Sequence, residues 1–209
     1  MKELLIIGAR GFGREIYFFA QQCRGYGTDF MIKGFLDDKA DALAALPGYA
    51  PILSSVENYV IQENDVFTCA LGSVKQKQHY VELIKAKGGV FQQLIHASAT
   101  IFQTSIIGEG CIISPRVEIT ADVRIGNYVT ITSNSVIGHD VKIGNYCHLG
   151  AASFLGGYAE LGDGVTLHPG AKVVPHKKVG AGATVGINSV VLFNIKPGVT
   201  VFGMPAMPV

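Results

Sequence analysis

The sequence predicts a small N-terminal α/β domain with Rossmann-like connections, followed by a left-handed parallel β-helix built from a hexapeptide repeat. Two observations lead to this prediction. Short apolar runs alternate with helical patterns over residues 1–90, and from Ile95 onward an aliphatic residue recurs at every sixth position. We therefore expect one domain over residues 1–90 and a second over residues 91–209.

The first domain is expected to alternate strands and helices along the chain. Apolar runs predict strands at residues 4–7, 32–36, 66–71 and 90–94, and amphipathic spacing predicts helices at residues 14–23 and 75–87. Strands that alternate with helices imply a small parallel sheet with helical crossovers.

A glycine-rich turn, Gly-Ala-Arg-Gly-Phe-Gly at residues 8–13, joins the first strand to the first helix. Its spacing, G-x-x-G-x-G, differs from the dinucleotide fingerprint G-x-G-x-x-G. A strand-to-helix turn nevertheless exposes backbone N–H groups that suit a phosphate. Arg10 could add positive charge, and Asp37 or Asp38 after the second strand could hold a ribose or base. We interpret the turn as a nucleotide site; the alternative is a βαβ turn with a structural role alone.

The repeat of the second half is regular over seventeen consecutive positions. A small or slender residue often lies two positions before each aliphatic residue, and glycine often follows it, so each unit predicts a short strand and a turn. Three such sides close a coil of eighteen residues, and a period of six does not fit an α-helix. The repeated positions are Ile95, Ile101, Ile107, Ile113, Ile119, Ile125, Ile131, Ile137, Ile143, Leu149, Leu155, Leu161, Leu167, Val173, Val179, Val185 and Val191.

His139 and Asp140 follow the pair Ile137 and Gly138, which places them at a corner of the coil. The residue eighteen positions later, in the adjacent coil, is Gly157. We expect its missing side chain to leave room for a ligand beside the imidazole, and Asp140 to orient the ring. We therefore favour a catalytic role for His139 over the alternative, a solvated corner residue.

His148 is expected to point outward from a strand that lies about one and a half sides further round the coil than His139. Sides on the order of 15 Å long keep the two histidines apart within one subunit. A site that uses both would therefore lie between subunits, and we predict a homotrimer. The outward positions on this side form an uncharged strip suited to contact: Ile112, Thr130, His148, Thr166 and Thr184.

Composition limits the partners and the compartment. The net charge of +1 gives no electrostatic reason to expect nucleic acid, and no apolar run approaches the ~20 residues of a membrane span. The cysteines have no metal-ligand spacing and the histidines form no His-x4-His pair, so no metal is expected. Cys111 and Cys147 lie two coils apart, roughly 10 Å, too far for a disulfide. We expect a reduced, cytoplasmic protein without a nucleic-acid or membrane partner.

Six segments together resemble the sugar O-/N-acyltransferases with a left-handed β-helix, typified by sialic acid O-acetyltransferases and by bacillosamine and perosamine N-acetyltransferases. The resemblance covers nearly the whole chain. The segments are residues 8–13, Phe-Leu-Asp-Asp at 35–38, Ala-Leu-Gly at 70–72, Leu-Ile-His-Ala-Ser-Ala at 94–99, Ser-Val-Ile-Gly-His-Asp at 135–140 and Phe-Gly-Met-Pro-Ala at 202–206.

The resemblance implies acetyl-CoA-dependent N-acetylation of a nucleotide-linked 4-amino-4,6-dideoxy sugar, used for surface polysaccharide (lipopolysaccharide) or glycan synthesis. O-acetylation of a sialic acid type of sugar is the alternative. The family's general base matches His139 and its carboxylate neighbour Asp140, while His148 and Gly157 match acetyl-CoA contacts. The residues that match nucleotide-sugar contacts are Arg10, Gly11, Phe12, Asp37, Asp38 and Gly72.

One position departs from the family pattern. Bacillosamine-type members usually carry His where this chain has Phe12, so UDP-, dTDP- and GDP-linked sugars all remain open. Two other classes of function are disfavoured. A non-catalytic scaffold does not explain the pairing of His139 with Gly157, and residues 1–90 give too small a sheet for a nicotinamide-dependent enzyme.

Overall fold

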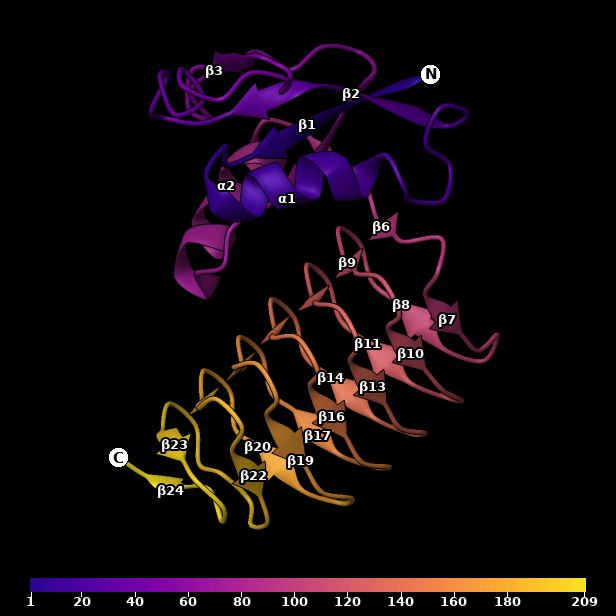
Figure 1. The fold of residues 1–209 in the computed structure, drawn as a ribbon, viewed down its shortest axis with the longest axis vertical. Helices are drawn as coiled ribbons and strands as arrows, with labels where there is room; N and C mark the ends of the chain where they lie inside the picture. The colour runs from indigo at the N-terminus through magenta and orange to yellow at the C-terminus, as the bar shows by residue number, and fades with distance from the viewer. The chain divides into compact units, whose positions relative to one another are not determined.

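The computed structural model describes all residues 1–209, which fold as two compact units, Met1–His96 and Ala97–Val209 (Figure 1). Neither helix of the chain has the length and apolar character needed to cross a bilayer. The first unit is an α/β domain, and the second is a parallel β-helix wound from short strands.

The first unit has a five-stranded sheet with two helices. Its strands are β1 (Lys2–Ile7), β2 (Phe30–Leu36), β3 (Ile52–Ser54), β4 (Asp65–Cys69) and β5 (Val90–Phe91), and its helices are α1 (Gly11–Ala20) and α2 (Val74–Ala86). The strand order is β3-β2-β1-β4-β5, and every pair is parallel. The chain thus builds outward on one side of β1, then returns to its other side with β4.

The central strand β1 is an apolar run because parallel sheets are covered on both faces. Its residues 4–7 are fully buried. Helix α1 packs close to the end of this strand through Gly13, where an added Cβ would lie 1.8 Å from the carbonyl oxygen of Gly8. The glycine turn therefore brings the helix N-terminus directly against the strand.

The predicted alternation of strands and helices is confirmed, with differences at the element ends. Helix α1 begins at Gly11, three residues before the expected start, because the Arg14 N–H already bonds the Arg10 carbonyl at 2.9 Å. Strand β3 was not predicted, since it is a three-residue edge strand without an alternating pattern. Residues 90–94 form two short strands, β5 and β6 (Leu94–Ile95), rather than one.

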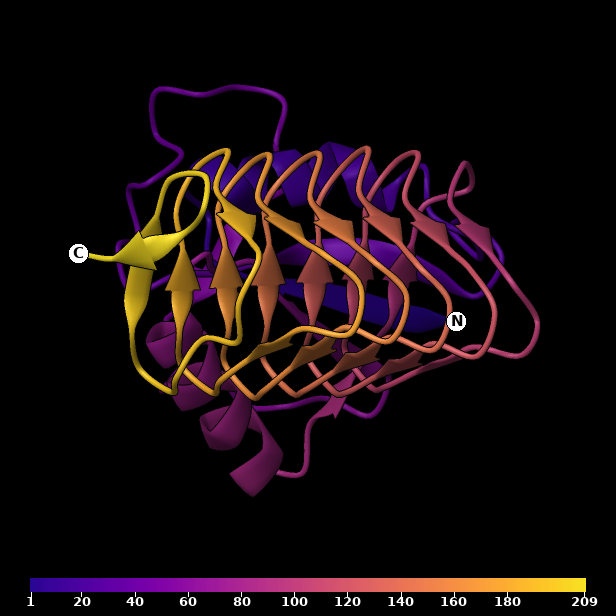
Figure 2. The ribbon, with the colours of Figure 1, turned by 90° about the horizontal axis from the view of Figure 1, so that it is seen from below.

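The second unit winds three strands per coil, and along most of its length each strand pairs with the strand eighteen residues further on (Figure 2). The last coil is shorter, since Thr184 pairs with Thr200. The first sheet has the order β22 (Val190–Val191), β19 (Lys172–Val173), β16 (Phe154–Leu155), β13 (Val136–Ile137), β10 (Glu118–Ile119) and β7 (Thr100–Ile101). The second has the order β20 (Lys178–Val179), β17 (Glu160–Leu161), β14 (Lys142–Ile143), β11 (Arg124–Ile125) and β8 (Ile106–Ile107). The third includes β24 (Met207–Pro208), β23 (Thr200–Phe202), β21 (Thr184–Val185), β18 (Thr166–Leu167), β15 (His148–Leu149), β12 (Thr130–Ile131) and β9 (Ile112–Ile113).

The predicted left-handed β-helix is confirmed, and the hexapeptide rule explains its core. The aliphatic residue of each repeat and the slender residue two positions before it point inward, as the buried Val129 and Ile131 illustrate. All four cysteines are free and buried, as expected for Cys111 and Cys147.

Hydrogen bonds between coils hold the corners in register. At one corner, the side-chain oxygens of Asn127, Asn145 and Asp163 each accept the backbone N–H of the residue eighteen positions earlier, at 2.9, 2.9 and 2.7 Å. Asn and Asp are common turn residues, and here their side chains also link each coil to the next. This ladder holds one corner of four successive coils in register.

Candidate functional site

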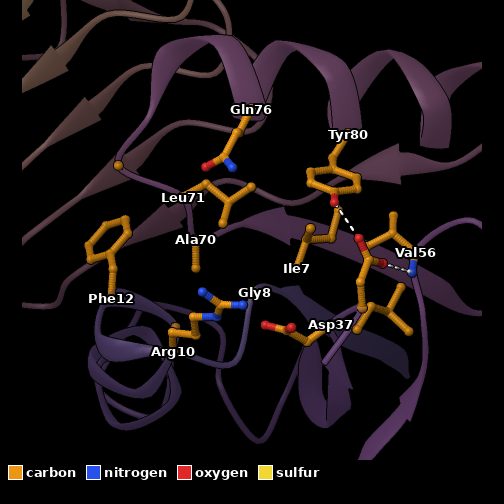
Figure 3. A pocket seen from close by; sticks show the side chains of 14 residues that line it. Ile7, Gly8, Arg10, Phe12, Asp37, Val56, Ala70, Leu71, Gln76 and Tyr80 are labelled. Atoms are coloured by element: carbon orange, nitrogen blue, oxygen red, sulfur yellow. Dashed lines mark hydrogen bonds between the residues drawn. The ribbon is translucent and has the colours of Figure 1, made fainter. Parts of the chain in front are cut away.

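A cavity of about 260 Å³ opens at the carboxyl ends of β1, β2 and β4 in the first unit (Figure 3). This is where the chain order of the sheet reverses, the usual ligand position in open α/β sheets. Its lining combines residues from the glycine turn, the loops after β2 and β4, and α2: Ile7, Gly8, Arg10, Phe12, Gly13, Leu36, Asp37, Asp38, Val56, Ala70, Leu71, Gly72, Gln76 and Tyr80.

The N-terminus of α1 borders this cavity without a side-chain cap. Its N-cap residue Arg10 makes no capping hydrogen bond, whereas the Ser73 side chain of α2 accepts the Gln76 N–H at 3.4 Å. An uncapped helix start leaves backbone N–H groups unsatisfied and carries partial positive charge. The α1 start therefore offers the cavity donors suited to a phosphate.

The Arg10 side chain reaches into the cavity and faces the Asp37 side chain across it (Figure 3). Gly72, on the loop after β4, presents open space, because an added Cβ would meet nothing within 4 Å. The same is true of Gly11, which lies in the first turn of α1 beside the cavity lining. The cavity thus combines one cationic side chain with backbone that a ligand can approach closely.

Both carboxylates after β2 are held by the protein. Asp37 accepts the Ala9 N–H at 2.8 Å and the Lys39 N–H at 2.9 Å. Asp38 accepts the Tyr80 hydroxyl (Figure 3), and this hydrogen bond, followed by partial burial, raises the pKa of Tyr80 to about 12. The phenol therefore stays protonated at neutral pH. Each carboxylate is fixed in orientation while keeping lone pairs for a ligand.

Of the residues expected to hold a nucleotide-sugar, five line this cavity: Arg10, Phe12, Asp37, Asp38 and Gly72. Sequence reasoning missed Gln76 and Tyr80, which also line it. They lie four positions apart on α2 and hence share one face of that helix. The spacing of two polar residues in the first turns after the Gly72 loop could have identified them.

A second group of candidate residues lies at a corner of the β-helix between β13 and β14. The Nδ1 atom of His139 lies 2.9 Å from Oδ2 of Asp140, and the imidazole is 60% exposed. With an ionised Asp140, Nδ1 carries the proton and donates, which leaves Nε2 as the basic nitrogen of a ring that is 60% exposed. The pair is therefore arranged as an oriented base.

The His139 imidazole lies directly over Gly157 of the next coil. A Cβ added at Gly157 would lie 2.7 Å from both Cε1 and Nε2 of the ring. We expected the missing side chain to leave room for a ligand; the imidazole itself uses that space. Gly157 therefore sets the position of the ring.

The backbone N–H of Gly157 donates no hydrogen bond within the chain. At the corner that holds Asn127 and Asn145, the equivalent backbone N–H donates to the side-chain oxygen of the residue eighteen positions further on. Here that residue is Pro175, whose side chain has no hydrogen-bond acceptor. Gly157, a partly exposed residue, thus keeps an N–H donor beside the imidazole that makes no bond within the chain.

His148 lies on β15, in the third sheet, where it pairs with Thr130 and Thr166. It does not share the His139 corner, which joins strands of the first and second sheets. Two members of the expected contact strip, Ile112 and Thr130, are already 99% buried within the single chain. The part of the strip open to another subunit is therefore His148, Thr166 and Thr184.

Two family models match successive parts of the chain. Residues 3–84 match the PglD N-terminal domain, and residues 90–191 match the GMPPB C-terminal domain. No curated protein sequence matches the chain.

Solved structures match over the full length. The acetyltransferase domain of PglB from Neisseria gonorrhoeae FA1090 is 27% identical, with a TM-score of 0.89 and 100% of both chains covered. PerB from Caulobacter crescentus, solved in complex with CoA and GDP-perosamine, is 26% identical, with a TM-score of 0.89, covering 100% of this chain and 98% of PerB. WeeI from Acinetobacter baumannii AYE, 23% identical with a TM-score of 0.73 and both chains covered completely, shares the fold.

Proposed function

We propose that this chain, which belongs to the sugar N-acetyltransferases of the hexapeptide family, acetylates the 4-amino group of a nucleotide-linked 4-amino-4,6-dideoxy sugar. Acetyl-CoA is the acetyl donor. The observation that carries the proposal is the His139 imidazole, which is 60% exposed and is oriented by Asp140 at 2.9 Å through its Nδ1 atom.

The cavity in the first unit supports the nucleotide part of the proposal. A nucleoside diphosphate needs donors for its phosphates, which the uncapped start of α1 and the Arg10 guanidinium supply. Its base and ribose carry N–H and O–H donors, for which Asp37 and Asp38 are fixed acceptors. Phe12 adds an apolar ring to the same lining.

The chemistry follows from the corner group. Nε2 of His139 takes a proton from the sugar amine as its nitrogen attacks the thioester carbonyl carbon. The Gly157 N–H stabilises the resulting oxyanion. The C–S bond then breaks, and the imidazolium returns the proton to the CoA thiolate. No acyl-enzyme forms, since the amine itself is the nucleophile.

Acetyl transfer to amino sugars linked to UDP, dTDP or GDP tests the proposed substrate. We expect CoA release and a product heavier by one acetyl group with at least one of the three. A free sialic acid is the comparison substrate, because the alternative is O-acetylation. Turnover with the free sugar and none with any nucleotide-linked amine would refute the proposal.

Arg10→Ala is expected to raise KM for the nucleotide-sugar about tenfold or more, because a hydrogen bond between charged groups is lost. KM for acetyl-CoA should remain within about twofold of the original value. Arg14→Ala is the matched control, since it removes the same charge from α1 at a position outside the cavity lining. Equal effects of the two substitutions would show that net charge, rather than contact by Arg10, determines affinity.

A homotrimer is part of the proposal because His139 and His148 lie on different parts of one β-helix. If acetyl-CoA contacts both, it lies in a groove between two subunits, and a closed three-fold ring is the simplest assembly. Light scattering after size-exclusion chromatography should give three times 22.2 kDa, about 67 kDa. A 22.2 kDa species at micromolar concentration would contradict a shared site.

A further inference from the structure

Three aromatic rings from successive coils contact one another in a row at the corner that holds His139. The Tyr158 and His139 rings meet edge to face, with centroids 5.2 Å apart and an interplanar angle of 89°. On its other side Tyr158 is stacked on His176, with centroids 4.9 Å apart and an angle of 6°. The catalytic imidazole thus lies at the end of a column of rings.

The backbone ties these corners together. The Tyr158 N–H donates to the His139 carbonyl oxygen, and the His176 N–H donates to that of Gly157, both at 3.0 Å. Asp140, Tyr158 and His176 occupy the same place in successive coils, with φ of 61°, 62° and 62°. A shift of one corner would therefore move the next.

Tyrosine is an unusual choice for this backbone conformation. The left-handed region favours glycine, asparagine and aspartate, and a larger side chain there costs stability. Local turn chemistry therefore does not explain Tyr158. Tyr128 and Tyr146 form a comparable stack at another corner, with centroids 5.0 Å apart, so such stacks also stabilise coils. What distinguishes Tyr158 is that its neighbour is the exposed imidazole of His139.

The imidazole needs this support because few other groups hold it. It is 60% exposed, it has one hydrogen bond, to Asp140, and Gly157 lies beneath its Cε1–Nε2 edge. A single hydrogen bond leaves rotation about the side-chain bonds possible. The Tyr158 ring closes a further side and restricts that rotation.

We infer that Tyr158 is a positioning residue that fixes the His139 imidazole for proton transfer, and that His176 holds Tyr158 in place. This inference rests on the proposed function, since it assigns a role within the same acetyl transfer. Edge-to-face rings bias an equilibrium by up to about tenfold, which is the size of the effect expected.

Tyr158→Asn is the sharpest variant because asparagine suits the left-handed conformation while removing the ring. We expect kcat to fall about tenfold, with KM for both substrates within about twofold. The unfolding temperature should change little, because relief of the left-handed strain at residue 158 offsets the two lost ring contacts. Tyr158→Phe keeps the ring and should retain kcat within about twofold. His176→Asn should give a smaller loss of kcat than Tyr158→Asn. Full activity of Tyr158→Asn, or equal losses in the Asn and Phe variants, would overturn the inference.

A second measurement separates this inference from the proposed function. Nitrogen-15 NMR of the His139 ring, without substrates, reports which nitrogen carries the proton. We expect one tautomer in the unmodified protein and in Tyr158→Phe, and a mixture in Tyr158→Asn. Identical ring spectra in all three proteins would overturn the positioning role. Changed spectra together with an active His139→Ala variant would instead refute the proposed base and leave the positioning of the ring intact.

Discussion

His139→Ala is expected to reduce kcat by about 10²–10⁴-fold, the usual contribution of a general base. The His139 imidazole is 60% exposed and has a hydrogen-bond partner that fixes its orientation, Asp140 at 2.9 Å. Without it, the attacking amine must lose its proton to water. Steady-state rates of CoA release with saturating substrates measure the loss.

The same variant should keep its fold and its affinity for acetyl-CoA. The imidazole is 60% exposed, and the corner is held by backbone hydrogen bonds such as Tyr158 N–H to the carbonyl oxygen of residue 139 at 3.0 Å, which alanine preserves. Unfolding temperature and CoA binding by calorimetry are the controls. Asp140→Asn, which retains a hydrogen-bonding side chain, should lower kcat less than His139→Ala. Near-normal turnover in the alanine variant would remove His139 from the mechanism.

The fold could be predicted because the repeat is itself a structural period. An aliphatic residue at every sixth position fixes which side chains point inward, and a strand slipped by one residue would turn Ile131 or Ile137 outward. The α/β unit was predicted with less accuracy at its ends. Its short edge strand β3 depends on pairing with β2, which local pattern does not encode.

The corner site could be predicted in part for the same reason. Positions eighteen residues apart must be neighbours, so the contact of His139 with Gly157 follows from counting along the chain. The eighteen-residue spacing does not determine the side-chain rotamer of His139. The imidazole turns toward the next coil and covers Gly157, which sequence alone cannot specify. The bond between Tyr80 and Asp38 joins residues forty-two positions apart in a unit without a repeat, and it was missed for that reason.

Gly157→Ala is expected to lower kcat by about 10–100-fold, because its methyl group would lie 2.7 Å from Nε2 and Cε1 of His139 and must displace the ring. The backbone at Gly157 is compatible with alanine, since its φ is not positive. The displaced atoms are the end of an exposed side chain, which can move at little cost. Stability should therefore change by less than about 1 kcal/mol.

Gly138→Ala, at the same corner, is expected to lower stability, whereas Gly157→Ala should leave stability nearly unchanged. Its Cβ would lie 2.9 Å from the Gly157 nitrogen and 2.9 Å from the Leu155 carbonyl oxygen, which are backbone atoms that cannot rotate away. This variant should lose about 1–3 kcal/mol of unfolding free energy. Denaturant titrations of both variants, beside their rates, separate displacement of the ring from damage to the coil.

The double variant His139→Ala with Gly157→Ala then tests whether the glycine acts through the histidine. If Gly157 serves to seat the imidazole, adding Gly157→Ala to a protein that lacks the ring should cost no further activity, so the two losses are strongly non-additive. If the losses multiply, the methyl group harms another step, such as donation from the Gly157 N–H to the oxyanion. In that case the loss should appear in kcat even without an imidazole, because the oxyanion forms whether or not a base assists the attack.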